Sequence, residues 1–248
     1  MTWLVAVLLS TMFFAWVSVL DKKLVSDLFS DVRDFFLIFG LMQIVIGPAF
    51  MLVAWATGGF GGTEGLAWSA ITGAAFVGGL LLFFYGLSIE EVSRATPMQS
   101  LSSVFATLIA VTLLGETLTL VQVAAIVVVV TGSVLVSIRR ENGALRFAHR
   151  RAFIVLMGSA MMLGIAFAAM KQATDVASVW AVEGVSVTVL GVLVLALVTR
   201  RERLMRVPAM LRVPHLASVM MLAEGLLAPA AVYTLALAFS LGTVSLVS

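Results

Sequence analysis

The feature that most constrains this chain is a series of long apolar runs. Eight runs of about 18 or more residues follow one another, each long enough to cross a hydrocarbon core of about 30 Å as a helix. Because the interior of a bilayer offers no hydrogen bonds to the backbone, each crossing must be helical. The runs are continuously apolar and do not alternate, which excludes a membrane barrel. Hydrophobic residues make up 62% of the chain and charged residues 11%, whereas soluble domains contain roughly half and a quarter.

The polar borders of these runs predict where the membrane helices begin and end. We expect crossings at about 2–20, 34–56, 67–88, 95–114, 119–138, 152–170, 180–199 and 216–239, and a further helix that starts near Gly242. The first run lacks a basic leader and a small-residue cleavage site, so we interpret it as a retained helix and not as a signal peptide. The sequence therefore predicts an all-α, polytopic membrane protein with about eight to nine helices.

The positive residues are concentrated in one set of loops. The loops after the first, third, fifth and seventh runs hold 14 of the 15 Lys and Arg residues, and Lys171 alone lies on the other side. The positive-inside rule places those four loops in the cytoplasm and the N-terminus outside. Basic loops also bind nucleic acids, but beside membrane helices the topological interpretation is favoured. We therefore expect the lipid bilayer as a partner and no nucleic acid.

Residues and motifs that would support catalysis are missing from the sequence. The chain has no cysteine and two histidines, which excludes disulfides, cysteine nucleophiles and a metal cluster built from histidine alone. It contains no H-E-x-x-H, G-x-S-x-G or P-loop motif. The glycine-rich stretch at 58–62 lacks the lysine that a phosphate site requires. We expect no enzyme activity, no metal and no cofactor.

The chain resembles itself at a shift of 148 residues, so that 85–100 aligns with 233–248. Positions that correspond in the same order are Tyr85 with Tyr233, Lys23 with Lys171, Asp27 with Asp175 and, after a four-residue adjustment, Gly40 with Gly184 and Gly47 with Gly191. Several matches at nearly one shift favour a duplication over chance similarity of apolar helices. We predict a first five-helix repeat at 1–138, a basic cytoplasmic linker at 139–151 and a second, incomplete repeat at 152–248. A repeat with an odd number of helices enters the membrane inverted, as in many secondary transporters.

The segment 103–137 carries a resemblance to a known family. It contains a helix, a Gly-Glu-x-Leu-Thr turn, a glutamine that opens the next helix and a glycine late in that helix: Gly115, Glu116, Leu118, Thr119, Gln122 and Gly132. This pattern resembles the end of an EamA repeat in the drug/metabolite transporter (DMT) superfamily, and the similarity covers essentially the whole chain in two copies. The sequence departs from the family at Ser103, where many members have proline, and at Ala125, where many have glycine. The second copy lacks the Gly-Glu segment.

The resemblance implies ten helices in two inverted five-helix repeats and a central cavity that carries a small metabolite, such as an amino acid or a sugar, by alternating access. It implies a protein of the plasma (inner) membrane, monomeric or homodimeric, with a proton as a candidate coupling ion. It also implies about 40 further residues after Ser248 in the complete protein. Members commonly have a cytoplasmic N-terminus, in contrast to the charge bias of this chain. The alternatives are a lipid-linked sugar flippase of the same superfamily and a non-transporting scaffold or inactive fragment.

Glu224 is the sharpest candidate for a functional residue. It lies eight residues into the run 216–239, about 12 Å along the helix axis and well inside the hydrocarbon. An ionisable group at that depth costs several kcal/mol unless it faces a cavity, pairs or takes up a proton. We expect Glu224 to bind a cationic substrate group or to carry the coupling proton. A protonated glutamate that bonds to a neighbouring helix is the structural alternative.

Glu183 and Lys171 lie on the non-cytoplasmic side, where they are candidates for a mutual ion pair or for substrate contact at the outer entrance. Snorkelling to the membrane interface explains both side chains equally well. Tyr85 and Tyr233 are the only tyrosines in the chain. For them, an interfacial aromatic belt is favoured over substrate contact.

Gln99, Ser100 and Ser103 belong to a polar stripe at the start of the run 95–114. Such a stripe either lines a polar cavity or forms a seam where two helices approach closely. Glu116 stands in the short turn before the run 119–138, where a carboxylate favours the helix N-terminus. For Glu116 we expect a structural role, capping the free amides of that helix.

Overall fold

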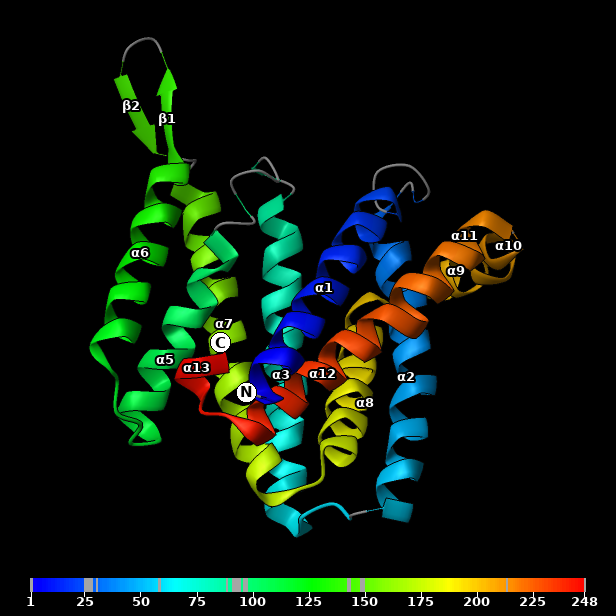
Figure 1. The fold of residues 1–248 in the computed structure, drawn as a ribbon. Helices are drawn as coiled ribbons and strands as arrows, with labels where there is room; N and C mark the ends of the chain where they lie inside the picture. The colour runs from blue at the N-terminus through cyan, green and yellow to red at the C-terminus, as the bar shows by residue number, and fades with distance from the viewer. Residues whose placement is uncertain are drawn as a thin grey trace. The chain divides into compact units, whose positions relative to one another are not determined.

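The structure, a computed structural model, describes residues 2–24, 29, 31–57, 59–87, 89–90, 95, 98–141, 144–147, 150–212 and 214–247. Its long helices are α1 (Thr2–Lys23), α2 (Val32–Thr57), α3 (Gly62–Leu87), α6 (Leu120–Ser137), α7 (Arg150–Val176) and α8 (Val179–Val198), and they overlap the runs expected from the sequence (Figure 1). The multi-pass helical membrane fold is therefore confirmed. Large apolar side chains such as Leu52, Trp55 and Leu120 are exposed on these helices, as expected where lipid covers them.

The last expected crossing is built from three successive segments. They are α11 (Pro214–Met220), the π-helical segment η2 (Met221–Leu227) and α12 (Ala228–Leu241). Two short helices, α9 (Arg201–Leu204) and α10 (Val207–Leu211), precede them in the basic connection after α8, and α13 (Val244–Val247) follows close to Gly242. Among the described residues, six helices are long and apolar enough to cross a membrane: α1, α2, α3, α7, α8 and the combined α11 to α12.

Two elements differ from the sequence expectations. The run 95–114 was expected to cross the membrane; its residues 96–97 lie outside the described residues, and the described helix α5 (Leu101–Leu113) has 13 residues and spans about 20 Å. It ends because Gly115 adopts a φ of 70°, the left-handed conformation that commonly closes a helix. The linker 139–151 was expected to be a loop, yet it contains an antiparallel hairpin of β1 (Ile138–Glu141) and β2 (Ala144–Phe147). The Asn-Gly pair between these strands in the sequence is typical of hairpins.

The chain forms two compact units. Unit 1 comprises 1–73, 172–242 and 247, and unit 2 comprises 74–171, 243–246 and 248. Unit 1 therefore contains α1, α2, α8, η2 and α12, together with the first part of α3. Unit 2 contains the rest of α3, most of α7, α5 and α6. In unit 2, α3 and α7 are joined by the Ser159 hydroxyl, which donates to the Gly79 carbonyl oxygen at 2.7 Å.

The closest helix crossing in unit 1 is made by glycines. A Cβ on Gly47 would overlap the Thr188 hydroxyl and lie 2.9 Å from the Gly184 carbonyl oxygen. A Cβ on Gly191 would lie 3.0 Å from the Gly40 carbonyl oxygen. α2 and α8 thus pack antiparallel with their backbones in contact, in the way that small residues permit in membranes.

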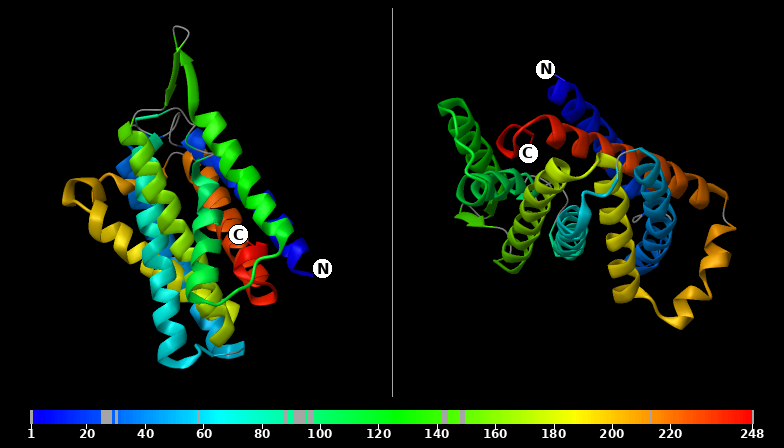
Figure 2. Two further views of the ribbon diagram at one scale, coloured as in Figure 1. Left: turned by 90° about the vertical axis from the view of Figure 1, so that its left-hand side faces the viewer. Right: turned by 90° about the horizontal axis from the view of Figure 1, so that it is seen from below.

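The remaining helices of unit 1 pack around this crossing. α1 runs antiparallel beside α12 (Figures 1 and 2), and the Ser10 hydroxyl donates to the Ala231 carbonyl oxygen at 2.9 Å. The Ser186 hydroxyl of α8 donates to the Ser69 carbonyl oxygen of α3 at 2.8 Å. η2 contacts α1 and α2, and α12 contacts α8. These contacts bring polar positions of α1, α2, α8 and the last crossing into one helical bundle.

Candidate functional site

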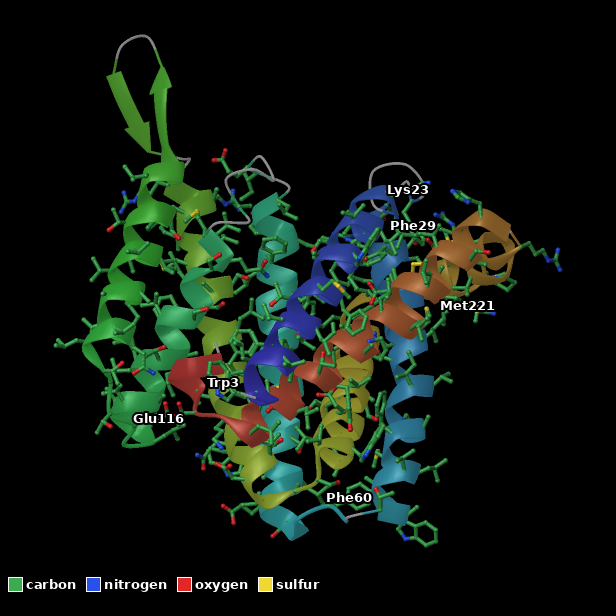
Figure 3. All side chains as sticks on the ribbon, in the orientation of Figure 1. Trp3, Lys23, Phe29, Phe60, Glu116 and Met221 are labelled. Carbon is green, nitrogen blue, oxygen red and sulfur yellow. The ribbon has the colours of Figure 1, made fainter. Side chains whose placement is uncertain are left out.

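Glu224 lies in η2, the widened segment that begins at Met221 (Figure 3). The backbone N–H of Ala228 bonds to the Ala223 carbonyl oxygen, five residues earlier, in place of the usual four. Pro229 explains the change, because its ring lacks an N–H and clashes with the carbonyl group four residues before it. Widening the preceding turn relieves that clash, and such π segments are frequent at functional sites.

The carboxyl groups of Glu224 and Asp21 are joined by a hydrogen bond. Asp21 lies near the end of α1, which packs against η2. Glu224 is 3% exposed, whereas Asp21 is half-buried and its Oδ1 has no hydrogen-bond partner in the structure. An ionised carboxylate is only an acceptor, so a hydrogen bond between two carboxyl groups requires a proton on one of them. The pair can therefore hold a proton within the helical bundle.

Sequence reasoning missed Asp21. It stands directly before Lys22 and Lys23, where it reads as part of the polar border of the first apolar run. Its place directly after the run 2–20 gave no sign that it is half-buried. The antiparallel packing of α1 on the last crossing then places Asp21 beside Glu224, which no single-helix pattern reveals.

Glu183 is the second buried acid of unit 1. It is 0% exposed, and neither of its oxygens has a hydrogen-bond partner in the structure. Ser178 starts α8 by accepting a hydrogen bond from the Ala181 N–H at 3.2 Å, and its hydroxyl donates to the Gly59 carbonyl oxygen at 3.1 Å. This cap fixes the first turns of α8, in which Trp180 and Glu183 lie three residues apart on one face.

Three aromatic rings form a cluster next to Glu183. The centroid of Trp180 lies 4.4 Å from that of Tyr233 and 5.5 Å from that of Phe50. Phe50 and Tyr233 are stacked at 6.4 Å. The carboxyl group of Glu183 is close enough to interact electrostatically with the Tyr233 hydroxyl. Helices α2, α8 and α12 thus each contribute one ring to this cluster, and all three rings are half-buried.

A third buried acid has a different partner. Asp34, on α2, is 2% exposed, and its Oδ1 lies 3.9 Å from Nε of Arg203 on α9. The Arg203 guanidinium also donates to the Val198 carbonyl oxygen at 3.0 Å. Asp34 is therefore a paired, structural acid. Across the described ranges, no group of three or more His, Asp and Glu side chains is placed to hold a metal ion.

Comparison with known proteins connects this architecture to a family. Residues 1–138 match the EamA-like transporter family, which covers more than half of the chain. The chain belongs to the EamA-like transporter family. A search of curated proteins gave no match. The matched region includes Asp21, whereas Glu183 and Glu224 lie beyond it. Family membership therefore supports transport as the class of activity and gives no role for these two acids.

The EamA-like motif is a structural element at the turn between α5 and α6. The Thr119 N–H and hydroxyl both donate to Oε1 of Gln122, at 2.8 and 2.9 Å, and the Gln122 N–H bonds to the Thr119 hydroxyl at 3.3 Å. This is a capping box at the start of α6. The structure therefore gives Thr119 and Gln122 the capping role expected of Glu116. Gly132, late in α6, has no atom within 4 Å of an added Cβ.

Glu116 is directed instead toward the last described helix. Its Oε1 accepts a hydrogen bond from the Val244 N–H at 2.8 Å, at the first residue of α13 (Figure 3). Glu116 follows Gly115, whose positive φ turns the chain away from the α5 axis before α6 begins. The carboxylate satisfies a helix N-terminus, as expected from its chemistry, and the N-terminus in this bond is that of α13.

The remaining predicted residues lie in unit 2. Lys171 is half-buried on α7, and because Glu183 belongs to unit 1 their pairing stays a prediction. At the start of α5, Ser100 is exposed, and Gln99 and Ser103 are half-buried. Tyr85 is 43% exposed and lies under the Arg151 guanidinium at 5.6 Å, a setting unlike the aromatic cluster around Tyr233.

Proposed function

We propose that this protein is a secondary carrier that moves a small metabolite across the membrane by alternating access, with the proton held by Asp21 and Glu224 as its coupling ion. The observation that carries the proposal is the hydrogen bond between Asp21 on α1 and Glu224, which lies in a π-helical segment of another membrane crossing. Membership of the EamA-like transporter family supports transport as the activity. We assign the carrier to the plasma (inner) membrane, with a small molecule and a proton as its partners.

The carboxyl pair offers a way to convert proton binding into helix movement. With one proton between them, Asp21 and Glu224 hold α1 against η2. Without it, two negative charges would face each other, and at 4 Å such charges repel by about 4 kcal/mol at an effective dielectric constant of about 20. Release of the proton therefore favours separation of α1 from η2. The widened turn at η2 is the part of the crossing with the least regular backbone bonding, so it is the natural hinge.

The crossing of α2 and α8 supports the inverted repeat on which alternating access depends. In the sequence alignment Gly40 corresponds to Gly184 and Gly47 to Gly191. In space, Gly40 contacts Gly191, and Gly47 contacts Gly184. Such an exchange of partners is what a twofold axis between equivalent helices produces. The axis would relate repeats at 1–138 and 152–248, joined by the linker 139–151.

The side-chain contacts around these glycines follow the same symmetry. The Leu195 side chain lies 3.0 Å from a Cβ placed on Gly40, and the Met51 side chain lies 2.6 Å from one placed on Gly184. The alignment that pairs Gly40 with Gly184 also pairs Met51 with Leu195. Met51 and Leu195 would therefore be equivalent positions of the two repeats, each packed against a glycine of the other repeat.

Flux measurements in proteoliposomes test the proposal. The purified chain is reconstituted and offered a panel of amino acids, sugars and other small metabolites, with and without a proton gradient. We expect uptake or exchange of one solute class that increases when the gradient is applied. A panel that includes a lipid-linked sugar separates the carrier from a flippase, which would move only the lipid. Absence of flux for every solute under every gradient would overturn the carrier proposal.

A further inference from the structure

We propose that Glu183 and the rings of Phe50, Trp180 and Tyr233 form a binding site for an organic cation with an alkylated ammonium group. The site lies in unit 1 and is distinct from the Asp21–Glu224 pair. Tyr233 follows Glu224 by nine residues on the same crossing, which corresponds to about 14 Å along a helix. That the bound cation is also the transported substrate rests on the proposed carrier function, whereas binding itself does not.

The carboxyl group of Glu183 is the first observation. Buried side-chain oxygens almost always have a hydrogen-bond partner, and each exception calls for an explanation. Both oxygens of Glu183 are such exceptions in the structure. Asp34 is just as buried but lies beside Arg203. An apolar residue would fill the position of Glu183 without the desolvation cost, so the acid points to a ligand that supplies the missing positive charge.

The aromatic cluster is the second, independent observation. Ring faces carry negative electrostatic potential and attract cations placed within about 6 Å of their centroids. Three rings from α2, α8 and α12 lie within 6.4 Å of one another, and one of them, Trp180, stands one turn before Glu183 on α8. The rings are half-buried and Glu183 is fully buried, so the rings carry the accessible surface of this cluster.

The composition of the site selects the kind of cation. A hard metal ion takes six or more oxygen ligands, and the site offers one carboxylate and one phenol. A primary ammonium group has three N–H donors, which three ring faces cannot satisfy as hydrogen-bond acceptors. An ammonium group whose substituents are methyl or other alkyl groups needs no such acceptors, and it gains from both the ring faces and the carboxylate. The chemistry therefore favours a tertiary or quaternary ammonium ligand.

Direct binding to the purified chain tests the inference. Choline serves as the cationic probe, and dimethylbutanol, in which carbon replaces the quaternary nitrogen, serves as its uncharged control. Calorimetry in detergent gives the affinity, and the shift in thermal unfolding provides a second readout because a ligand of the folded state stabilises it. We expect choline to bind and to raise the unfolding temperature, and dimethylbutanol to do neither.

Variants then assign the binding to these side chains. Glu183→Gln should weaken choline binding at least about tenfold, since the carboxylate is the only formal charge in the site. Trp180→Leu and Tyr233→Leu should weaken it about threefold to thirtyfold, the range of one cation–π contact. Tyr233→Phe keeps the ring and should bind as the wild type does. Trp55→Leu is the matched control, because Trp55 is 80% exposed on α2 and outside the cluster.

Each outcome either supports or overturns the site. Equal binding of choline and dimethylbutanol, or unchanged choline binding in Glu183→Gln, would overturn it. If Trp180→Leu fails to fold, the comparison of Tyr233→Leu with Tyr233→Phe still tests the site. Loss of choline binding in both variants, or in neither, would contradict a role of the ring. Choline binding without any flux in proteoliposomes would leave the site standing and would count against the carrier proposal alone.

Discussion

Glu224 and Glu183, two of the buried acids of unit 1, lie in chemically different surroundings. At Glu224 the neighbour is a second acid, Asp21, and the two carboxyl groups are joined by a hydrogen bond. At Glu183 the neighbours are aromatic rings, and neither oxygen has a hydrogen-bond partner in the structure. The difference teaches that the groups facing a buried acid, and not its depth alone, decide what it can bind. An acid pair suits a proton, and an acid under ring faces suits an organic cation.

The two sites also lie toward opposite ends of the unit 1 helices. Asp21 stands near the end of α1 that leads to 25–31, and the Arg203 contacts of Asp31 and Asp34 lie at that end. Glu183 is near the start of α8, where Ser178 bonds to Gly59 in the α2–α3 connection. The same pair of helices, α2 and α8, runs between the ends. Changes to the shared crossing should therefore affect both sites, and changes at one acid only its own site.

The largest effect is expected from Gly47→Leu, which breaks the scaffold that both sites share. The added side chain would overlap Thr188 where two backbones touch, at a cost of about 3 kcal/mol or more. We expect little folded protein by size-exclusion chromatography and a lower unfolding temperature for what remains. Gly132→Leu is the matched control, since an added Cβ meets no atom within 4 Å. Equal yields of the two variants would contradict a close α2–α8 crossing.

Glu224→Gln should affect the Asp21–Glu224 pair and leave the Glu183 site unchanged. Glutamine keeps the size of the side chain but cannot release a proton, so proton-driven flux should fall at least about tenfold while expression stays intact. Asp21→Asn should have the same effect, and the double variant should be no worse than either single one, because the groups act as a unit. Glu64→Gln, an exposed acid in the first turn of α3, is the control. Unchanged proton-driven flux in Glu224→Gln removes the coupling role.

Pro229→Ala tests whether the widened turn positions Glu224. Alanine restores the N–H and removes the ring clash, so η2 should shorten toward a regular α-helix and rotate Glu224 relative to Asp21. We expect a partial loss of proton-driven flux, smaller than in Glu224→Gln, with no loss of folded protein. Pro48→Ala, within α2, is the control for removing a proline from a membrane helix. Full flux in Pro229→Ala would show that the π segment is incidental.

The smallest effect is expected in unit 2, which contains neither Glu183 nor Glu224. Thr119→Ala removes the hydroxyl of the capping box at α6 and should cost about 1 kcal/mol of stability. Flux and choline binding should be unchanged. The control, Thr112→Ala, loses bonds to two carbonyl oxygens of its own helix. Thermal unfolding measures both variants, and an equal shift in the two would argue against the cap.

Some of this architecture was readable from the sequence and some was not. Long apolar runs predict membrane helices because the bilayer leaves the backbone no alternative, and Glu224 is conspicuous as a charge inside such a run. Its partner Asp21 was not, since a residue at the border of a run carries no signal of depth. Glu183 was expected at the outer entrance but is fully buried, because packing with other helices decides exposure near a helix end.

Local motifs were misjudged for a different reason. The Thr119 and Gln122 pair has the spacing of a capping box, yet the neighbouring Glu116 was expected to cap α6 because of its charge. Its contact with Val244 joins residues 128 positions apart and leaves no trace in a local pattern. The hairpin at 138–147 does have a local sequence signal, which is the Asn-Gly pair. The segment was expected to be a basic loop because of its arginines.

The central claim is that Asp21 and Glu224 share a proton in the resting protein, and infrared difference spectroscopy tests it without knowledge of the substrate. Spectra of the reconstituted wild type and of Glu224→Gln are compared in the region of the carboxylic acid C=O stretch, with Glu64→Gln as the control. The account predicts a protonated carboxyl band at neutral pH that is present in the wild type and in Glu64→Gln and is lost or shifted in Glu224→Gln and Asp21→Asn. Identical carboxyl bands in all four proteins would contradict the shared proton.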